Sequence, residues 1–174
     1  RKAFLKDDSI GSLLRLDYAL KTGRMRKLRI KLEVDANPPS GATYAMPILD
    51  YPFPAAIRVF DLPSLFAGKI HALLCRNYLK GRDWYDFVWY TARNVPINHA
   101  LLSAALQQTG PWKGRNLLTD NAWCCEQLHA TIESLNWHQA REDVRRFVKP
   151  AEWPSLELWS SAFFHDQCRK LGGN

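Results

Sequence analysis

Residues 61–87 gather charged side chains whose types and spacing could serve an anionic ligand. The stretch predicts two helices joined by a basic link. Six charged residues fall near the corner between these helices: Lys69, Arg76, Lys80, Arg82, Asp83 and Asp86. Cations grouped in this way can hold an anion, and carboxylates beside them can orient the cations. We therefore expect the chemistry of the chain at this corner.

The first helix of this stretch is indicated by an apolar stripe that contains one lysine. Asp61 is a favourable N-cap residue, and Pro63 falls in the first turn, where proline is tolerated. Apolar residues then recur at three-and-four spacing, and Lys69 lies one turn from both Leu65 and Leu73. A lysine in such a stripe either extends along the apolar surface to reach water or directs its ammonium at an anion.

The second helix opens with acidic residues that allow two interpretations. Asp86 follows Asp83 by three residues and Arg82 by four, so the three side chains are neighbours on the helix surface. Arg82 could pair with Asp86 to fix the corner, or it could face a ligand directly. The structural alternative is that Asp83 and Asp86 cap the helix and meet its positive end. Capping preferences alone leave both interpretations open.

A strand with one charged face provides a second candidate site. In residues 28–35, apolar side chains alternate with charged ones, among them Lys31, Glu33 and Asp35. These three would place oxygen ligands and a cation in a row, as magnesium-dependent phosphoryl chemistry requires. Alternatively, mixed charges on an exposed sheet face pair across strands and keep the sheet soluble. The strand by itself favours the structural interpretation.

The order of the sequence patterns predicts an α+β fold, a short antiparallel or mixed sheet followed by a helical bundle. Strand patterns occupy residues 2–6, 14–20, 28–35, 46–51 and 56–60. A loop at residues 21–24 predicts a hairpin between the second and third of these strands. Helical patterns follow the corner at residues 96–108, 119–135, 137–148 and 155–170. We therefore expect a strand-rich part at residues 1–60 and a helical domain at residues 61–174.

The charge and composition of the chain limit its class. The 174 residues carry a net charge of +7, and residues 1–31 hold ten Lys or Arg against three Asp. This surplus could steer a polyanion to the surface, or it could form a solvated face. No uncharged apolar run reaches about 18 residues, so we expect no membrane-spanning helix. The four cysteines and five histidines show no metal-ligand spacing, which is typical of a reduced, cytoplasmic protein.

Three stretches within residues 28–87 resemble motifs of one family. Residues 30–33, Ile-Lys-Leu-Glu, resemble a strand motif Lys-x-Asp/Glu, and residues 61–69 of the first helix resemble the family's third motif, with Lys69 as its lysine. Residues 80–86, Lys-Gly-Arg-Asp-Trp-Tyr-Asp, resemble the motif Arg-x-Lys-Asp-x-x-Asp with arginine and lysine exchanged. The region thus resembles the nucleotidyltransferase toxins of the AbiEii/AbiGii abortive-infection type, members of the DNA polymerase β-like nucleotidyltransferase superfamily.

The resemblance implies a role for each matched residue. Glu33 would hold a metal ion, and Asp83 and Asp86 would join it as catalytic residues. Nucleotide binding would fall to the cations Lys31, Lys69, Arg76, Lys80 and Arg82. Residues 1–60 would be the strand-rich remainder of a nucleotidyltransferase core.

The resemblance also implies the reaction and the partners. A toxin of this kind would use Mg²⁺ to transfer a nucleotide from a nucleoside triphosphate (NTP) to an RNA such as tRNA, or to a protein. Its partner would be a cognate antitoxin in the bacterial cytoplasm, with no membrane association.

The family's first motif, Gly-Ser followed by Asp-x-Asp, carries the metal and has no counterpart in this sequence. Gly11-Ser12 is followed only by Asp17, and no Asp-x-Asp occurs. We therefore expect these residues to be the C-terminal part of such an enzyme and to be inactive by themselves.

Two other classes of function compete with this interpretation. A non-catalytic basic module would bind nucleic acid or a partner in a salt-dependent way, indifferent to NTP and Mg²⁺. A metal-dependent nuclease could use the strand that carries Glu33 and Asp35. Its usual Glu-x-Lys order is absent because Lys31 precedes Glu33, so this class ranks last.

Overall fold

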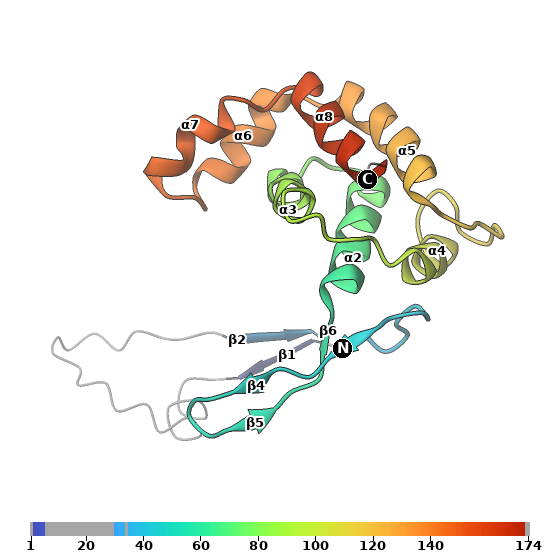
Figure 1. Cartoon of the computed structure of the whole chain (residues 1–174), viewed down its shortest axis with the longest axis vertical. Coiled ribbons are helices and arrows are strands. Elements are labelled where there is room, and N and C mark those ends of the chain that lie inside the picture. Colours follow the sequence, from blue (N-terminus) through green and yellow to red (C-terminus); the bar gives the residue numbers. More distant parts are fainter. Residues whose placement is uncertain (1, 6–29, 34, 173–174) are drawn as a thin grey trace, which may run out of the picture. The chain divides into compact units, whose positions relative to one another are not determined.

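The computed structural model describes residues 2–5, 30–33 and 35–172 (Figure 1). The chain divides into two compact units, Arg1–Pro38 and Pro39–Asn174, and each is described by itself. Short antiparallel sheets precede a series of helices, which confirms the predicted α+β class. No helix in these ranges has the length and apolar character needed to cross a membrane.

The described residues of the N-terminal unit form an antiparallel strand pair. Strand β1, Lys2–Leu5, pairs with β2, Ile30–Glu33, so that Lys2 lies opposite Glu33 and Leu5 opposite Ile30. The strands predicted at residues 2–6 and 28–35 are thus confirmed over these central residues. The predicted strand at 14–20 and the hairpin loop at 21–24 lie outside the described residues.

A two-stranded arm opens the second unit (Figure 1). Strand β3, Tyr44–Ala45, pairs with β6, Val59–Phe60, and β4, Ile48–Leu49, pairs with β5, Ala55–Ala56. The strands predicted at 46–51 and 56–60 are therefore present only as two-residue pieces. Proline has no amide donor for a ladder, and three prolines interrupt this segment: Pro47, Pro52 and Pro54.

The helical part begins with α2, Leu62–Cys75, and α3, Gly81–Thr91. These are followed by α4, His99–Gln108, α5, Asn121–Ser134, and α6, Trp137–Arg145. A short 3₁₀ turn, Pro150–Glu152, leads into α7, Trp153–Leu156, and then α8, Ser161–Gly172. The helices predicted at 96–108, 119–135 and 137–148 are confirmed with shorter ends.

Short polar side chains start most of these helices. The carboxylate of Asp61 accepts a hydrogen bond of 2.9 Å from the backbone N–H of Ser64, and Pro63 lies in the first turn, as predicted. The same type of cap starts α4, α5 and α6, from Asn98, Asp120 and Asn136.

The single helix predicted at residues 155–170 is wrong. Helix α7 ends at Leu156, and the hydroxyl of Ser160 accepts a hydrogen bond of 3.2 Å from the N–H of Phe163 at the start of α8. A local serine cap thus starts a new helix where the apolar pattern suggested a continuous one.

Helix α2 lies at the centre of the helical part, packed against α3, α4 and α5, and α8 lies beside α5 (Figure 1). Phe66 of α2 and Phe87 of α3 are fully buried. Trp84 of α3 meets the rings of Trp137 and Phe164 edge-on, at centroid distances of 5.2 and 5.1 Å. This aromatic core fixes α3 against α2, α6 and α8, and so fixes the corner between α2 and α3.

Candidate functional site

The corner between α2 and α3 brings together two cations and two carboxylates. Nζ of Lys69, on α2, lies 2.6 Å from Oδ2 of Asp86 and 3.5 Å from Oδ1 of Asp83, both on α3. Arg76, at the C-terminal cap of α2, places Nη1 2.7 Å from Oδ2 of Asp83. Lys69 therefore bridges the two aspartates, and Asp83 lies between two positive charges.

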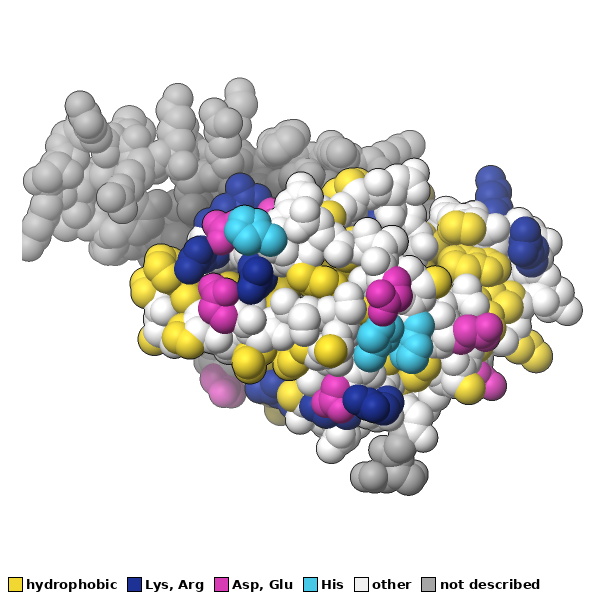
Figure 2. All heavy atoms as spheres, turned by 90° about the horizontal axis from the view of Figure 1, so that it is seen from above, with side chains coloured by type: hydrophobic (Ala, Val, Ile, Leu, Met, Phe, Trp, Pro, Cys, Tyr) yellow, Lys and Arg dark blue, Asp and Glu magenta, His cyan; other side chains and the backbone are white. Residues whose placement is uncertain are grey.

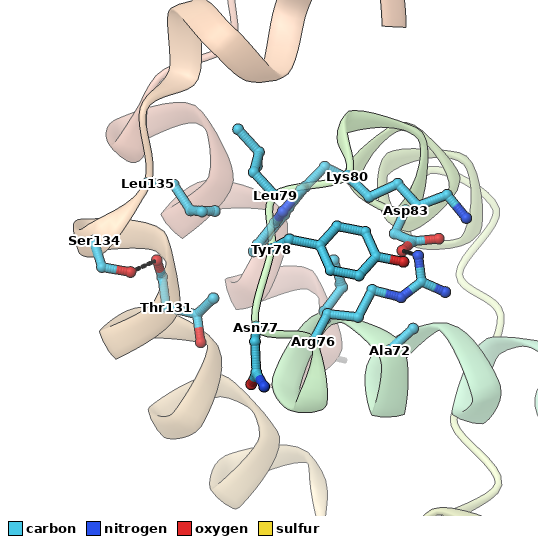
Figure 3. Close-up of a pocket in the computed structure, with 12 residues that line it drawn as sticks. Ala72, Arg76, Asn77, Tyr78, Leu79, Lys80, Asp83, Thr131, Ser134 and Leu135 are labelled. Carbon is cyan, nitrogen blue, oxygen red and sulfur yellow. Dashed lines mark hydrogen bonds and ion pairs between the residues drawn. The ribbon is translucent and has the colours of Figure 1, made fainter. Parts of the chain in front are cut away.

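The four residues differ in their access to solvent. The side chain of Asp83 is 3% exposed, whereas those of Lys69, Asp86 and Arg76 are 35%, 37% and 30% exposed. Figure 3 shows the guanidinium of Arg76 turned toward Asp83. Within the described residues, Nη1 of Arg76 and Oδ2 of Asp83 have no hydrogen-bond partner, so they meet as an ion pair with poor N–H alignment. Asp83 is thus a buried anchor, and Lys69 and Asp86 form the accessible part of the cluster.

Electrostatics keep Lys69 charged. Burial lowers the pKa of Lys69, but the hydrogen bond and charge of Asp86, together with the charge of Asp83, raise it further, and the net pKa lies above its ordinary value. An ammonium group at this position is therefore retained at neutral pH. The same cluster acts on Tyr90, where burial first and the Asp86 charge second raise the pKa of the phenol.

The alternative that Asp83 and Asp86 cap α3 is wrong, although Asp83 does lie in the first turn, near the positive end of the helix. Helix α3 begins at Gly81, and its N-cap residue Lys80 makes no side-chain capping hydrogen bond. Asp143 of α6 accepts a hydrogen bond of 2.9 Å from the N–H of Gly81 and so caps α3 from outside. Asp83 and Asp86 lie within the helix, where their carboxylates are free to pair with the cations of α2.

Gly81 sets the distance between α3 and α6. A Cβ atom at this position would lie 2.2 Å from the carbonyl oxygen of Ala140 and 2.7 Å from Cγ2 of Val144. Only a residue without a side chain allows the two helices to approach this closely. Neither Gly81 nor Asp143 was predicted to be a site residue. A glycine at the start of a helix was the one local sign of this close packing. Asp143 is 62 residues from Gly81 in the sequence, so nothing near Gly81 indicated this cap.

Two pockets flank Asp83. The first has a volume of about 210 Å³ and is lined in part by Arg76, Tyr78, Lys80 and Thr131 (Figure 3). The second has a volume of about 440 Å³ and lies between α3 and residues 144–152. Its cationic lining residues are Lys69, Lys80, Arg82 and Lys149.

Arg82 does not pair with Asp86, because Lys69 occupies that carboxylate. Its guanidinium instead lies 4.3 Å from the ring centroid of Phe147. The second alternative raised for Arg82, that it faces a ligand, is compatible with its place in the wall of the larger pocket.

The structure thus gathers six predicted site residues at one corner: Lys69, Arg76, Lys80, Arg82, Asp83 and Asp86. Lys31 and Glu33 belong to β2 in the other unit, and their side chains lie outside the described part of the chain. Among the described residues, no group of three His, Cys, Asp or Glu side chains could hold a metal ion. Asp83 and Asp86 do not fit a metal as arranged here, because each already contacts a cation.

Comparison with known proteins agrees with this corner and its motifs. The family model described as "Nucleotidyl transferase AbiEii toxin, Type IV TA system" matches residues 3–161, which include α2, α3 and both walls of the larger pocket. No curated protein and no solved structure matched the chain. Since the match spans most of the sequence, the chain belongs to the AbiEii family of nucleotidyltransferase toxins of type IV toxin–antitoxin systems.

Proposed function

We propose that the protein encoded by the complete reading frame transfers a nucleotide from an NTP to an RNA such as tRNA, or to a protein. It acts in the cytoplasm, and a cognate antitoxin controls it. The observation that carries this proposal is the position of Lys69, a charged ammonium held between Asp83 and Asp86 at the edge of a pocket large enough for a nucleotide. The family membership supports the reaction class.

The position of Lys69 suits a cation that must bind a triphosphate in a fixed orientation. Displacement of pyrophosphate builds negative charge on the phosphate oxygens, and a cation fixed in advance stabilises that charge without reorganisation. Lys69 is oriented by Asp86, and a half-exposed ammonium can exchange one carboxylate contact for a phosphate oxygen. Lys80 and Arg82 line the same pocket and would hold further phosphate oxygens.

The remaining residues act through these cations. Arg76 contacts Asp83 and so holds the buried carboxylate that faces Lys69. Asp83 and Asp86 therefore position Lys69, and Asp86, the more exposed of the two, is also placed to accept a proton from an incoming hydroxyl.

Magnesium would supply charge neutralisation at the attacked phosphorus when bound. In this proposal its ligands include Glu33, with Lys31 beside it to contact phosphate, and exclude Asp83 and Asp86, which are paired with cations.

The test uses the complete reading frame, with Mg²⁺, each α-labelled NTP and total cellular RNA, followed by electrophoresis of RNA and protein. We expect label in RNA or protein, lost in Lys69→Ala and Asp86→Asn and retained in Lys113→Ala, an exposed lysine outside both pockets. Salt-dependent RNA binding without any transfer would instead support a non-catalytic binding module.

A further inference from the structure

The larger pocket has a second wall to which neither the motifs nor the family match assigns a role. One wall is the exposed side of α3, with Lys80, Arg82 and Tyr85. The other is formed by the end of α6 and the turn that follows it, with Phe147 and Lys149 among its residues. The pocket volume of about 440 Å³ suits a ligand of the size of one nucleotide.

The charges in this pocket do not balance once its internal contacts are counted. Lys69 is paired with Asp83 and Asp86. The other carboxylate in the lining is that of Glu152, which keeps its negative charge while it accepts a hydrogen bond of 3.0 Å from the hydroxyl of Tyr85. Three cations remain with no carboxylate within 4 Å in the described part of the chain: Lys80, Arg82 and Lys149. The pocket therefore favours an anionic ligand.

Elsewhere in the helical part, many basic side chains face carboxylates. On the face shown in Figure 2, basic and acidic side chains are interspersed among uncharged ones. Many other arginines of the helical part form ion pairs with carboxylates, among them Arg141 with Glu157 and Arg146 with Asp143. Within the described ranges, the pocket brings three cations without a carboxylate partner to one place.

Arg82 lies against Phe147 and has no carboxylate within 4 Å among the described residues. The Phe147 side chain is half exposed, and the guanidinium groups of Arg82 and Arg146 lie 4.3 and 4.8 Å from its ring centroid. Arg82 is thus held by stacking, which leaves its N–H donors available to an anion. The half-exposed ring also supplies apolar surface, continued by Val144 and Val148, for a flat uncharged group.

We propose that this pocket binds one nucleotide unit, with the phosphate on Lys80, Arg82 and Lys149 and the base against the wall that contains Phe147. The combination of unpaired cations with an aromatic and aliphatic wall matches a ligand that is charged at one end and flat and apolar at the other. The proposal rests on the proposed function and adds Phe147 and Lys149 to its binding residues. The nucleotide comes either from the NTP or from the end of the RNA acceptor, since both present the same chemistry.

The test measures binding separately from transfer, with the complete reading frame. Fluorescently labelled NTP and a short labelled RNA are titrated against the parent protein, Phe147→Leu and Lys149→Gln at fixed ionic strength. Matched controls are Leu118→Ala and Lys113→Gln, because both residues are exposed and line neither of the pockets described above. Thermal unfolding of every variant shows that a loss of binding is not a loss of fold.

We expect both pocket variants to weaken binding roughly fivefold or more, the scale of a lost base stack or phosphate contact, while the controls bind as the parent does. Weakened NTP binding alone assigns the pocket to the donor nucleotide, weakened RNA binding alone assigns it to the acceptor, and a loss of both shows a shared nucleotide site. Unchanged binding of both ligands by both pocket variants overturns the proposal, as does a parent protein that binds neither ligand. If the pocket variants lose binding in this way but the parent protein transfers no label, the proposed function is overturned and the pocket assignment stands.

Discussion

Nζ of Lys69 lies 2.6 Å from Oδ2 of Asp86, so the middle of α2 is tied to the middle of α3 by a pair that is still partly open to solvent. Asp83, which also contacts Lys69, differs from this pair because its side chain is buried. The two aspartates of one motif therefore have different physical roles, and substitutions can separate them.

Lys69→Ala should weaken NTP binding more than it weakens the fold. The half-exposed pair contributes about 1 kcal/mol or less to stability, because water screens it. A lost phosphate contact, in contrast, should weaken NTP binding roughly tenfold or more. Thermal unfolding and NTP titration of the complete protein check both effects. A large drop in melting temperature with unchanged affinity would mean that Lys69 serves the core.

Asp83→Asn and Asp86→Asn form a matched pair that should destabilise the protein to different extents. Removal of the charge of Asp83 leaves Arg76 without its buried partner and should lower the free energy of unfolding by about 3 kcal/mol. Asp86→Asn should lower it by about 1 kcal/mol or less, because its pair is exposed. Urea denaturation of the two variants measures this difference. Equal losses would contradict the division into a buried anchor and an accessible pair.

Gly81→Ala and Gly68→Ala should change stability in opposite directions. A methyl group at Gly81 meets the backbone of α6. The free energy of unfolding of Gly81→Ala should therefore fall by at least about 1–3 kcal/mol, the usual range for overpacking. A methyl group at Gly68, within α2, meets nothing within 4 Å and should stabilise the helix by roughly 0.5–1 kcal/mol. Denaturant unfolding of both variants decides this. A neutral Gly81→Ala would show that α6 can move away from α3.

The contribution of Lys69 to stability should persist through neutral pH and disappear at high pH. The pKa of Lys69 is raised in the folded protein, so its stabilising charge is complete below the ordinary value of 10.5 and is lost as pH rises through the raised pKa. The pKa values of Tyr85 and Tyr90 are also raised, so these tyrosines too make the protein less stable as pH rises. The parent protein is therefore compared with Lys69→Met, which keeps both tyrosines. The difference in unfolding free energy between parent and variant should stay constant from about pH 7 to 9 and shrink above about pH 10.5. A difference that falls before pH 9 would contradict the assignment.

Local features of the corner follow from the residues of each helix alone. Three-and-four spacing predicted α2, Asp61 and Pro63 marked its start, and the position of Lys69 in an apolar stripe left two options for its ammonium, water or an anion, of which the structure shows the second. These features depend on residues within one or two helical turns, and the structure confirms them. The motifs at residues 30–33, 61–69 and 80–86 likewise predicted the family that the match over residues 3–161 shows.

Which charges meet depends on how the helices pack. Arg82 and Asp86 are neighbours in sequence, yet Lys69 reaches Asp86 from another helix, and Arg82 stacks on Phe147 instead. The cap of α3 comes from Asp143, 62 residues away, because the absence of a side chain at Gly81 lets α6 approach. Helical periodicity is encoded locally, whereas ion pairs and caps between helices depend on how the helices pack, and that packing is set by a core formed from distant parts of the chain.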